Sequence, residues 1–160
     1  MDYKISEVIL PGAVDFNPGS FKNKDDLFNH MVSLLYQAGR IKSEEKFLQS
    51  LYEREDIGST YMGNFIAIPH GKSDTVISPS IAFCRCSEGV FYESNNEAGT
   101  VKLIFMLAIP KDTAADDYIR VLSTLARLLM YDEFVGALYD SQNYDDLIKA
   151  LKTTESILID

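Results

Sequence analysis

The chain has 160 residues, 46% of them hydrophobic, which is long enough for one ordinary domain with a sizeable core. Its 15 basic and 24 acidic residues give a formal net charge of −9 that is spread along the chain, which argues against nucleic acid and anionic membranes as partners. No apolar stretch approaches the roughly 18 to 20 residues that span a bilayer, and the first ten residues lack the regions of a signal peptide. We expect a single domain over residues 1–160, cytoplasmic and without direct membrane insertion.

The first third of the chain predicts a strand and then two helices. Residues 5–10 are typical of a strand. Residues 24–39 place apolar side chains on one helical face, with Asn23 as the expected N-cap and Gly39 as the C-terminal stop. Residues 43–55 follow the same pattern from a serine cap. Both segments therefore predict amphipathic helices with one buried face.

The middle of the chain predicts strands, and the last third predicts helices. The strand candidates are residues 65–69, 80–86 and 101–110, with a shorter piece at 90–92. The segment 101–110 is apolar almost throughout, as expected for a central strand covered on both faces. Thr113 and Asp116 resemble a capping box that opens a helix over 116–130, and shorter helices are expected at 132–139 and 144–151. This order predicts an α/β fold, a three-layer α/β/α sandwich with a central mixed β-sheet flanked by helices.

Residues 63–72 read GNFIAIPHGK and place a histidine directly after an apolar run. Pro69 lacks a backbone donor and holds the preceding residue extended, so we expect the strand to stop there and His70 to lie at its end. Gly71 permits close approach of another backbone or an anion, and Lys72 adds positive charge. The residues alone leave open whether His70 is a functional group or a hydrogen-bonded structural histidine.

Other polar and sulfur-containing side chains carry plainer interpretations. His30 falls at the edge of the apolar stripe of its helix, where a boundary histidine is expected. Cys84 and Cys86 lie two residues apart on one strand face, which favours small, buried, unpaired thiols. The two histidines are far apart in the sequence and no metal-binding spacing is present, so we expect no metal site and reject a metal hydrolase.

Four stretches in order resemble a known family. They are YEREDIGSTYMGN, FIAIPHGK with the following SPSIAF, VKLIFMLAIP, and YIRVLSTLARLL. Together they cover most of residues 24–151, and the AIPHGK motif with an arginine–glutamate pair upstream is a specific combination. The chain is similar to the IIA component of the bacterial phosphoenolpyruvate-dependent sugar phosphotransferase system, of the fructose and mannitol class. That family's fold, a mixed sheet flanked by helices, agrees with the predicted elements.

The resemblance implies a phosphotransferase that works through a phosphohistidine. His70, in the AIPH motif, is then the residue that accepts a phosphoryl group, and a neutral imidazole is a good nitrogen nucleophile at cell pH. Arg54 matches the family's arginine, and its planar guanidinium suits phosphoryl oxygens. Ser59 and Thr60 are candidate hydrogen-bond donors, and Lys72 is a weaker candidate. The alternative for Arg54 is a surface ion pair of little consequence.

Tyr118 marks a departure from the family pattern. Many members carry a second histidine at the start of the helix that follows the VKLIFMLAIP strand, where this chain has Tyr118. One interpretation makes Tyr118 a core aromatic, and the other makes its hydroxyl a hydrogen-bond donor in place of the missing imidazole. Both stay open at this point.

The resemblance also implies protein partners. HPr is the expected phosphoryl donor, and a IIB component with a membrane IIC is the expected acceptor system for sugar uptake. Because the donor and the product are both phosphoproteins, the resemblance implies no cofactor. Tyr61, Met62 and Phe65 are candidates for a small apolar docking patch. Three alternatives remain: a regulatory, nitrogen-type IIA protein, a galactitol-type IIA, and a binding module that has lost phosphorylation.

Overall fold

The computed structural model describes residues 4–159. It divides into two compact units, one formed by Leu10–Asp112 and the other by Met1–Ile9 with Thr113–Asp160. The first unit contains the helices α2 (Lys24–Gln37) and α3 (Glu44–Glu55) and the strands β1 (Ile9–Asp15, whose first residue precedes the unit), β2 (Tyr61–Gly63), β3 (Ile66–Ala67), β4 (His70–Ser73), β5 (Ser80–Ser94) and β6 (Glu97–Pro110). The second contains the helices α1 (Ile5–Val8), α4 (Ala115–Leu128), α5 (Asp132–Asp140) and α6 (Tyr144–Ile159).

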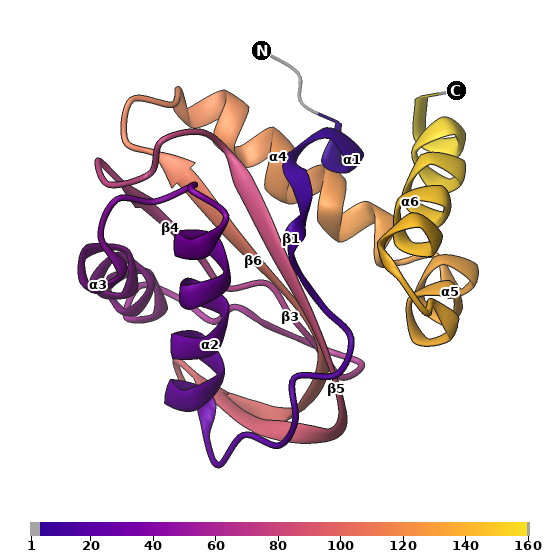
Figure 1. Ribbon diagram of the computed structural model, residues 1–160, viewed down its shortest axis with the longest axis horizontal. Helices are drawn as coiled ribbons and strands as arrows, with labels where there is room; N and C mark the ends of the chain where they lie inside the picture. Colours follow the sequence, from indigo (N-terminus) through magenta and orange to yellow (C-terminus); the bar gives the residue numbers. More distant parts are fainter. Residues whose placement is uncertain (1–3, 160) are drawn as a thin grey trace. The chain divides into compact units, whose positions relative to one another are not determined.

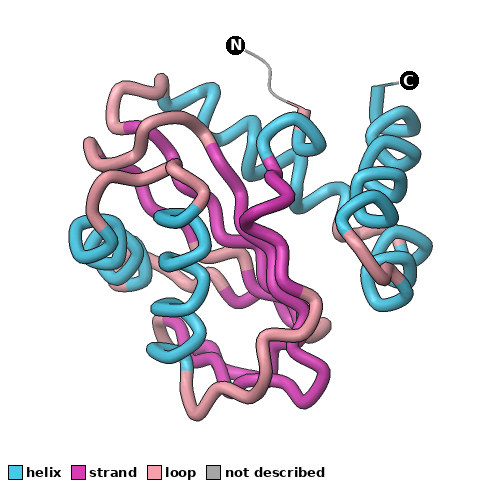
Figure 2. Tube along the Cα trace, in the orientation of Figure 1, coloured by secondary structure: helices cyan, strands magenta, loops and turns pink. Residues whose placement is uncertain are grey.

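The strands of the described residues form one mixed sheet in the order β1-β5-β6-β3-β2, with β4 also paired to β6. β5 and β6 form a long hairpin (Figure 2). The two strands are antiparallel and join at Asn95 and Asn96, and β3 and β4 run parallel to β6. Both turn residues have positive φ, 46° and 71°, as a two-residue hairpin turn requires. β6 is therefore the central strand, as its apolar run predicted.

Two helices pack against this sheet within the first unit. α2 lies over β5 and α3 over β4 (Figure 1). The core beneath them is formed by Phe28, Leu35, Phe47, Leu51, Ala82, Cys84, Ile104 and Met106, among others. The strand members of this core alternate along β5 and β6, as the period of two in a strand requires. Burial of this apolar face drives the helices onto the sheet.

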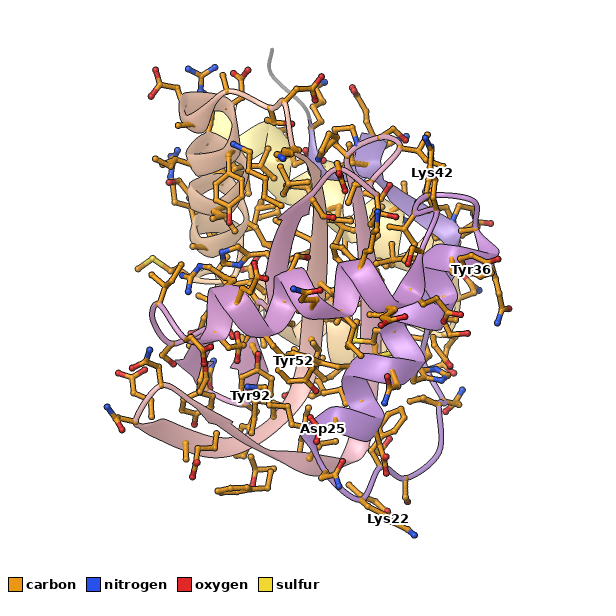
Figure 3. All side chains as sticks on the ribbon, turned by 90° about the vertical axis from the view of Figure 1, so that its left-hand side faces the viewer. Lys22, Asp25, Tyr36, Lys42, Tyr52 and Tyr92 are labelled. Atoms are coloured by element: carbon orange, nitrogen blue, oxygen red, sulfur yellow. The ribbon has the colours of Figure 1, made fainter. Side chains whose placement is uncertain are left out.

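The predicted ends of α2 and α3 are confirmed. Asn23 accepts a hydrogen bond from the backbone N–H of Asp26, and Ser43 does the same for Lys46. Gly39 follows α2 with a φ of 74°, a left-handed conformation that glycine adopts without strain. The two helices are also tied side by side, because the Tyr52 hydroxyl donates a hydrogen bond to Asp25 (Figure 3). Burial, which is the largest effect, and that bond raise the Tyr52 pKa above its ordinary value.

The second unit is helical. α1, α4, α5 and α6 pack together, and the Tyr144 hydroxyl donates a hydrogen bond of 2.8 Å to the carbonyl of Ile9. The predicted strand over residues 5–10 is wrong in its first four residues, because residues 5–8 form α1. Ile5 and Val8, three residues apart, then lie on one buried helical face. Tertiary packing has overridden the strand preference of these β-branched residues.

Two other predictions need correction. Ala114, and not Thr113, occupies the N-cap position of α4. The alanine methyl group cannot accept a hydrogen bond, so this helix has no side-chain cap. The pieces 80–86 and 90–92 belong to one strand, β5, which is continuous through an irregularity between Arg85 and Val90. Within the described residues no helix combines the length and apolar character needed to cross a membrane.

Candidate functional site

His70 opens a strand, and this corrects the expectation that it ends one. β3 covers only Ile66 and Ala67, and Phe65 before it lies in the left-handed region with a φ of 65°. Pro69 has no N–H to add to a ladder, so pairing stops and resumes with His70 opposite Leu107 of β6. The Pro69 carbonyl accepts a hydrogen bond of 3.0 Å from the Leu107 N–H, which anchors the break to the central strand.

The imidazole of His70 is held in one tautomer by the backbone carbonyl two residues earlier. Its side chain is buried, with 3% of the residue exposed. Nδ1 lies 2.9 Å from the carbonyl oxygen of Ile68. A carbonyl oxygen only accepts, so Nδ1 carries the proton and donates. In the neutral ring, Nε2 therefore keeps the lone pair that a nucleophile needs.

The surroundings of His70 keep the ring neutral. Burial lowers the His70 pKa below its ordinary value, and this is the largest effect. The hydrogen bond to Ile68 raises the pKa, the positive charge of Arg54 lowers it, and the negative charge of Glu55 raises it. The net direction is downward, so the imidazole is uncharged at neutral pH and available as a nucleophile.

Arg54 comes to His70 through the packing of α3 against β4. It lies in the last turn of α3 and donates a hydrogen bond of 2.8 Å from Nη1 to the carbonyl of Gly58. This bond folds the guanidinium back over the loop that follows the helix. A side chain at Gly71 would collide with Ser50 of α3, so glycine there allows the close contact between helix and strand. Arg54 and His70 are 16 positions apart in the sequence, but in the fold the charge of Arg54 acts on the imidazole of His70.

Glu55 is the second residue of the arginine–glutamate pair upstream of the AIPHGK motif, but the sequence patterns predicted no role for it. It is a carboxylate with 6% of the residue exposed, and it forms an ion pair with Lys24 of α2. The Thr60 hydroxyl donates a hydrogen bond to its other oxygen. A signal was present, because Glu55 continues the buried stripe of Phe47 and Leu51 at four-residue spacing, where an acidic side chain is unusual.

The remaining candidates near the motif take different positions. Ser59 accepts a hydrogen bond of 3.1 Å from the Tyr61 N–H and so shapes the loop. Thr60 is buried against Glu55, whereas Lys72 is exposed on β4. Phe65 and Met62 keep 47% and 40% of their surface exposed, as a docking patch requires. Tyr61, half-buried over Gly99, is largely a packing residue.

Tyr118 lies in the first turn of α4, in the other unit from His70. Its N–H donates a hydrogen bond of 3.1 Å to the carbonyl of Ala114, and the residue is half-buried. Its role as a hydroxyl donor at the site is a prediction. His30, in contrast, is settled: it is a boundary residue with a 31% exposed side chain and an Nε2 contact of 2.8 Å with Asp15.

Cys84 and Cys86 lie in β5, in the core of the first unit. Cys84 and Cys86 are buried free thiols, as expected, and burial raises the Cys86 pKa to about 12. Such thiols are poor nucleophiles. Among residues 4–159 no group of three or more His, Cys, Asp or Glu side chains could hold a metal ion.

Comparison with known families defines the class of this site. Residues 8–154 match the family model described as "Phosphoenolpyruvate-dependent sugar phosphotransferase system, EIIA 2", so the protein is a component of a phosphotransferase system. The chain belongs to the EIIA 2 family of the phosphoenolpyruvate-dependent sugar phosphotransferase system.

Named relatives agree with this family. The chain is 34% identical over 145 residues to a PTS system fructose-specific EIIABC component of Bacillus subtilis, covering 91% of this chain but only 22% of that protein. It is 32% identical over 120 residues to a PTS system fructose-specific EIIA component of Haloferax volcanii, covering 75% of this chain and 77% of that one. The chain therefore spans about a fifth of the first relative and most of the second.

Solved structures share the fold. The nitrogen regulatory protein IIA-Ntr from Neisseria meningitidis is 27% identical, with a TM-score of 0.81 over 92% of this chain and 98% of that one. The complex of enzyme IIAMTL and phosphorylated enzyme IIBMTL from Escherichia coli contains a chain that is 22% identical, with a TM-score of 0.71 over 91% of this chain and 99% of that one. The predicted fold class, a three-layer α/β/α sandwich with a mixed sheet, is confirmed.

Proposed function

We propose that this chain is a phosphoryl carrier of the sugar phosphotransferase system, with His70 as the residue that is phosphorylated. The observation that carries the proposal is the hydrogen bond from His70 Nδ1 to the Ile68 carbonyl, because it presents Nε2 as the unprotonated nitrogen of a neutral ring. Family membership supplies the chemistry, phosphoryl transfer through a component of that system.

In the proposed reaction the lone pair of His70 Nε2 attacks the phosphorus of a phosphohistidine on the donor HPr. The new Nε2–P bond forms as the donor's N–P bond breaks, and the donor imidazole recovers its electron pair. The ring of His70 then carries positive charge, which the Ile68 carbonyl stabilises through the proton on Nδ1. A second transfer returns the electron pair to Nε2 and delivers the phosphoryl group to the acceptor.

Arg54 is the proposed stabiliser of the phosphoryl oxygens. Its positive charge already acts on the His70 imidazole, and its hydrogen bond to Gly58 leaves further guanidinium N–H groups as donors. A fixed cation beside the nucleophile stabilises charge that develops on the equatorial oxygens during transfer. We assign Tyr118 the role of a hydroxyl donor to the same phosphoryl group, in place of the second histidine that many relatives have.

The proposed acceptor is a IIB component that works with a membrane IIC in sugar uptake. Two observations support it: the fructose-specific EIIABC relative joins these components in its name, and a similar fold has been solved with phosphorylated IIB. These partners would meet the chain in the cytoplasm. Met62 and Phe65, exposed beside the AIPH motif, would contribute to docking. We propose one functional domain over residues 1–160, since the family match runs through both compact units.

The nitrogen-regulatory alternative rests on the IIA-Ntr structure, which shares this fold. The sugar-specific names of the relatives favour transport over regulation, and the fructose-specific names favour the fructose class over the galactitol class. The proposed function needs His70 to become phosphorylated and to pass the group on to IIB.

The test is incubation with phosphoenolpyruvate, enzyme I and HPr, followed by intact mass at neutral pH. We expect one acid-labile phosphoryl group per chain, lost in His70→Ala and retained in the matched variant His30→Ala. Nitrogen-15 NMR of the product should show the phosphoryl group on Nε2. Stable phosphorylation of His70→Ala would overturn the assignment.

A further inference from the structure

A buried polar cluster lies between α2, α3 and the β5–β6 hairpin, and the proposed reaction does not use it. Its centre is the carboxylate of Glu55. One oxygen forms the ion pair with Lys24 Nζ, and the other accepts the hydrogen bond of the Thr60 hydroxyl. The Thr60 hydroxyl has one proton, which it donates to Glu55. The Tyr92 hydroxyl, 2.5 Å away, is therefore the donor in its hydrogen bond with Thr60. We call Lys24, Glu55, Thr60 and Tyr92 the Glu55 cluster.

The hairpin anchors this cluster through its last residues. Lys24 Nζ also donates to the carbonyl of Glu93 at 2.8 Å, and the Ser94 hydroxyl accepts from the Thr60 N–H at 2.9 Å. The Asn95 side chain donates to the carbonyls of Glu55, at 3.3 Å, and Asp56, at 3.0 Å. The exposed carbonyls at the end of α3 are thereby satisfied by the hairpin turn. The loop after Arg54 is fixed at several points.

The Glu55 cluster is connected to His70 by two further hydrogen bonds. The carbonyl of Thr60 accepts from the Ile68 N–H at 3.0 Å. The carbonyl of the same Ile68 accepts from His70 Nδ1 at 2.9 Å. Hydrogen bonds therefore run from Thr60 to Ile68 and from Ile68 to the imidazole, and the second bond sets the tautomer of His70. The contacts of Glu55 also hold the end of α3, and therefore the neighbouring residue Arg54.

We propose that Glu55 is a positioning residue for the phosphoryl site: its buried carboxylate locks Thr60 and the end of α3 so that the Ile68 carbonyl and the Arg54 guanidinium are held at His70. This inference rests on the proposed function for its chemical meaning. The geometry it describes exists without any phosphoryl group.

The position requires a carboxylate, because Lys24 and Thr60 each need an acceptor oxygen and Lys24 needs a negative charge. An amide in its place has one acceptor oxygen and no charge. If that oxygen faces Lys24, the NH2 group must donate to Thr60, whose hydroxyl then has to reverse its bond with Tyr92, and the ion pair with Lys24 is lost in either orientation. The charge also reaches His70, whose pKa it raises against the opposite effect of Arg54. The titratable side chains packed around Glu55 are Lys24 from α2, Tyr52 from α3 and Tyr92 from β5. Burial raises the pKa of both tyrosines, so they are uncharged at neutral pH.

The decisive experiment compares Glu55→Gln with Glu53→Gln, an exposed glutamate two residues earlier on the same helix. Nitrogen-15 NMR of the unphosphorylated proteins reports the tautomer and pKa of His70. We expect Glu55→Gln to lower the His70 pKa further and to weaken the preference for the proton on Nδ1, whereas Glu53→Gln matches the parent. The rate of phosphoryl uptake from phosphorylated HPr should fall roughly tenfold or more only in Glu55→Gln.

A second pair of variants keeps the test decisive if Glu55→Gln does not fold. Thr60→Val leaves the ion pair with Lys24 but removes the hydroxyl, and Thr60→Ser keeps the hydroxyl. We expect the loss of tautomer preference and rate in Thr60→Val alone. A folded Glu55→Gln or Thr60→Val with the parent's His70 tautomer and uptake rate overturns the inference. If the parent accepts no phosphoryl group, the proposed function fails, while the NMR comparison still decides the positioning role.

Discussion

The carbonyl oxygen of Ile68 accepts a hydrogen bond of 2.9 Å from Nδ1 of His70, two residues further along the chain. This contact is local in sequence, yet it depends on the interruption of strand pairing at Pro69, where the imidazole turns back toward the carbonyl of Ile68. It fixes the proton on one ring nitrogen and leaves the other as the nucleophile. Burial adds a second constraint, because it lowers the His70 pKa and keeps the ring neutral.

The first prediction concerns the pH dependence of His70. An NMR titration should give a His70 pKa below the ordinary value of 6.5, since burial is the dominant effect. The unfolded chain then binds more protons than the folded one between the two pKa values. The free energy of unfolding should therefore fall as the pH falls below about 6.5, and this contribution should be constant above it.

The control for that prediction is His70→Gln, which has no titrating group at this position. Chemical denaturation across the same pH range should show a smaller loss of stability in His70→Gln than in the parent. Equal slopes in the two proteins, or a titration at or above 6.5, would contradict the assigned burial effect.

Arg54 gives the second prediction. Arg54→Lys keeps the positive charge but loses the planar set of donors that suits phosphoryl oxygens. Phosphoryl transfer to and from His70 should slow by roughly tenfold or more, while thermal unfolding stays close to the parent. The matched control is Arg127→Lys, also in the last turn of a helix but exposed. Parent-like rates in Arg54→Lys would leave Arg54 as a loop-shaping residue only.

Tyr118 gives the third prediction. If its hydroxyl donates to phosphorylated His70, Tyr118→Phe keeps the ring and its packing but removes a hydrogen bond to a charged acceptor, worth about 1.5 to 3 kcal/mol. The variant should melt like the parent, and its phosphorylated form should hydrolyse or transfer at an altered rate. Tyr118→His should restore the behaviour of relatives with two histidines. Unaltered kinetics in Tyr118→Phe, with loss of stability only in Tyr118→Ala, would make the residue a packing aromatic.

Gly71 gives the fourth prediction, on the contact between β4 and α3. A Cβ at this position would collide with the Ser50 hydroxyl and approach Phe47 to 3.2 Å, so Gly71→Ala should destabilise the fold by about 1 to 3 kcal/mol. Gly136 of α5 is the matched control, because nothing lies within 4 Å of an added Cβ there. Gly136→Ala should stabilise the protein by roughly 0.5 to 1 kcal/mol.

Denaturation midpoints of the two glycine variants would decide between these outcomes. Adding Ser50→Ala to Gly71→Ala should recover part of the loss, since it removes the hydroxyl that collides. If Gly71→Ala is as stable as Gly136→Ala, the helix and strand are not in the close contact described above.

The sequence by itself determined the elements that depend on local rules. The helix ends could be predicted at Asn23, Gly39 and Ser43, because each uses one short side chain or one glycine at a fixed position relative to the helix end. The central strand β6 was readable because a strand buried on both faces is apolar throughout. His70 was readable through the AIPHGK motif together with the resemblance to a family.

Only the tertiary structure decided how these pieces meet. Residues 5–8 became a helix because packing in the second unit outweighed their strand preference. Glu55 became the centre of a cluster because α2, the loop at Thr60 and β5 converge on it. Its place on the buried stripe of α3 marks it as unusual, but the sequence does not show which partners it meets. Hydrogen-bond partners such as Lys24 and Tyr92 are fixed by strand register and helix packing, which depend on the burial of the whole core rather than on any short stretch of chain.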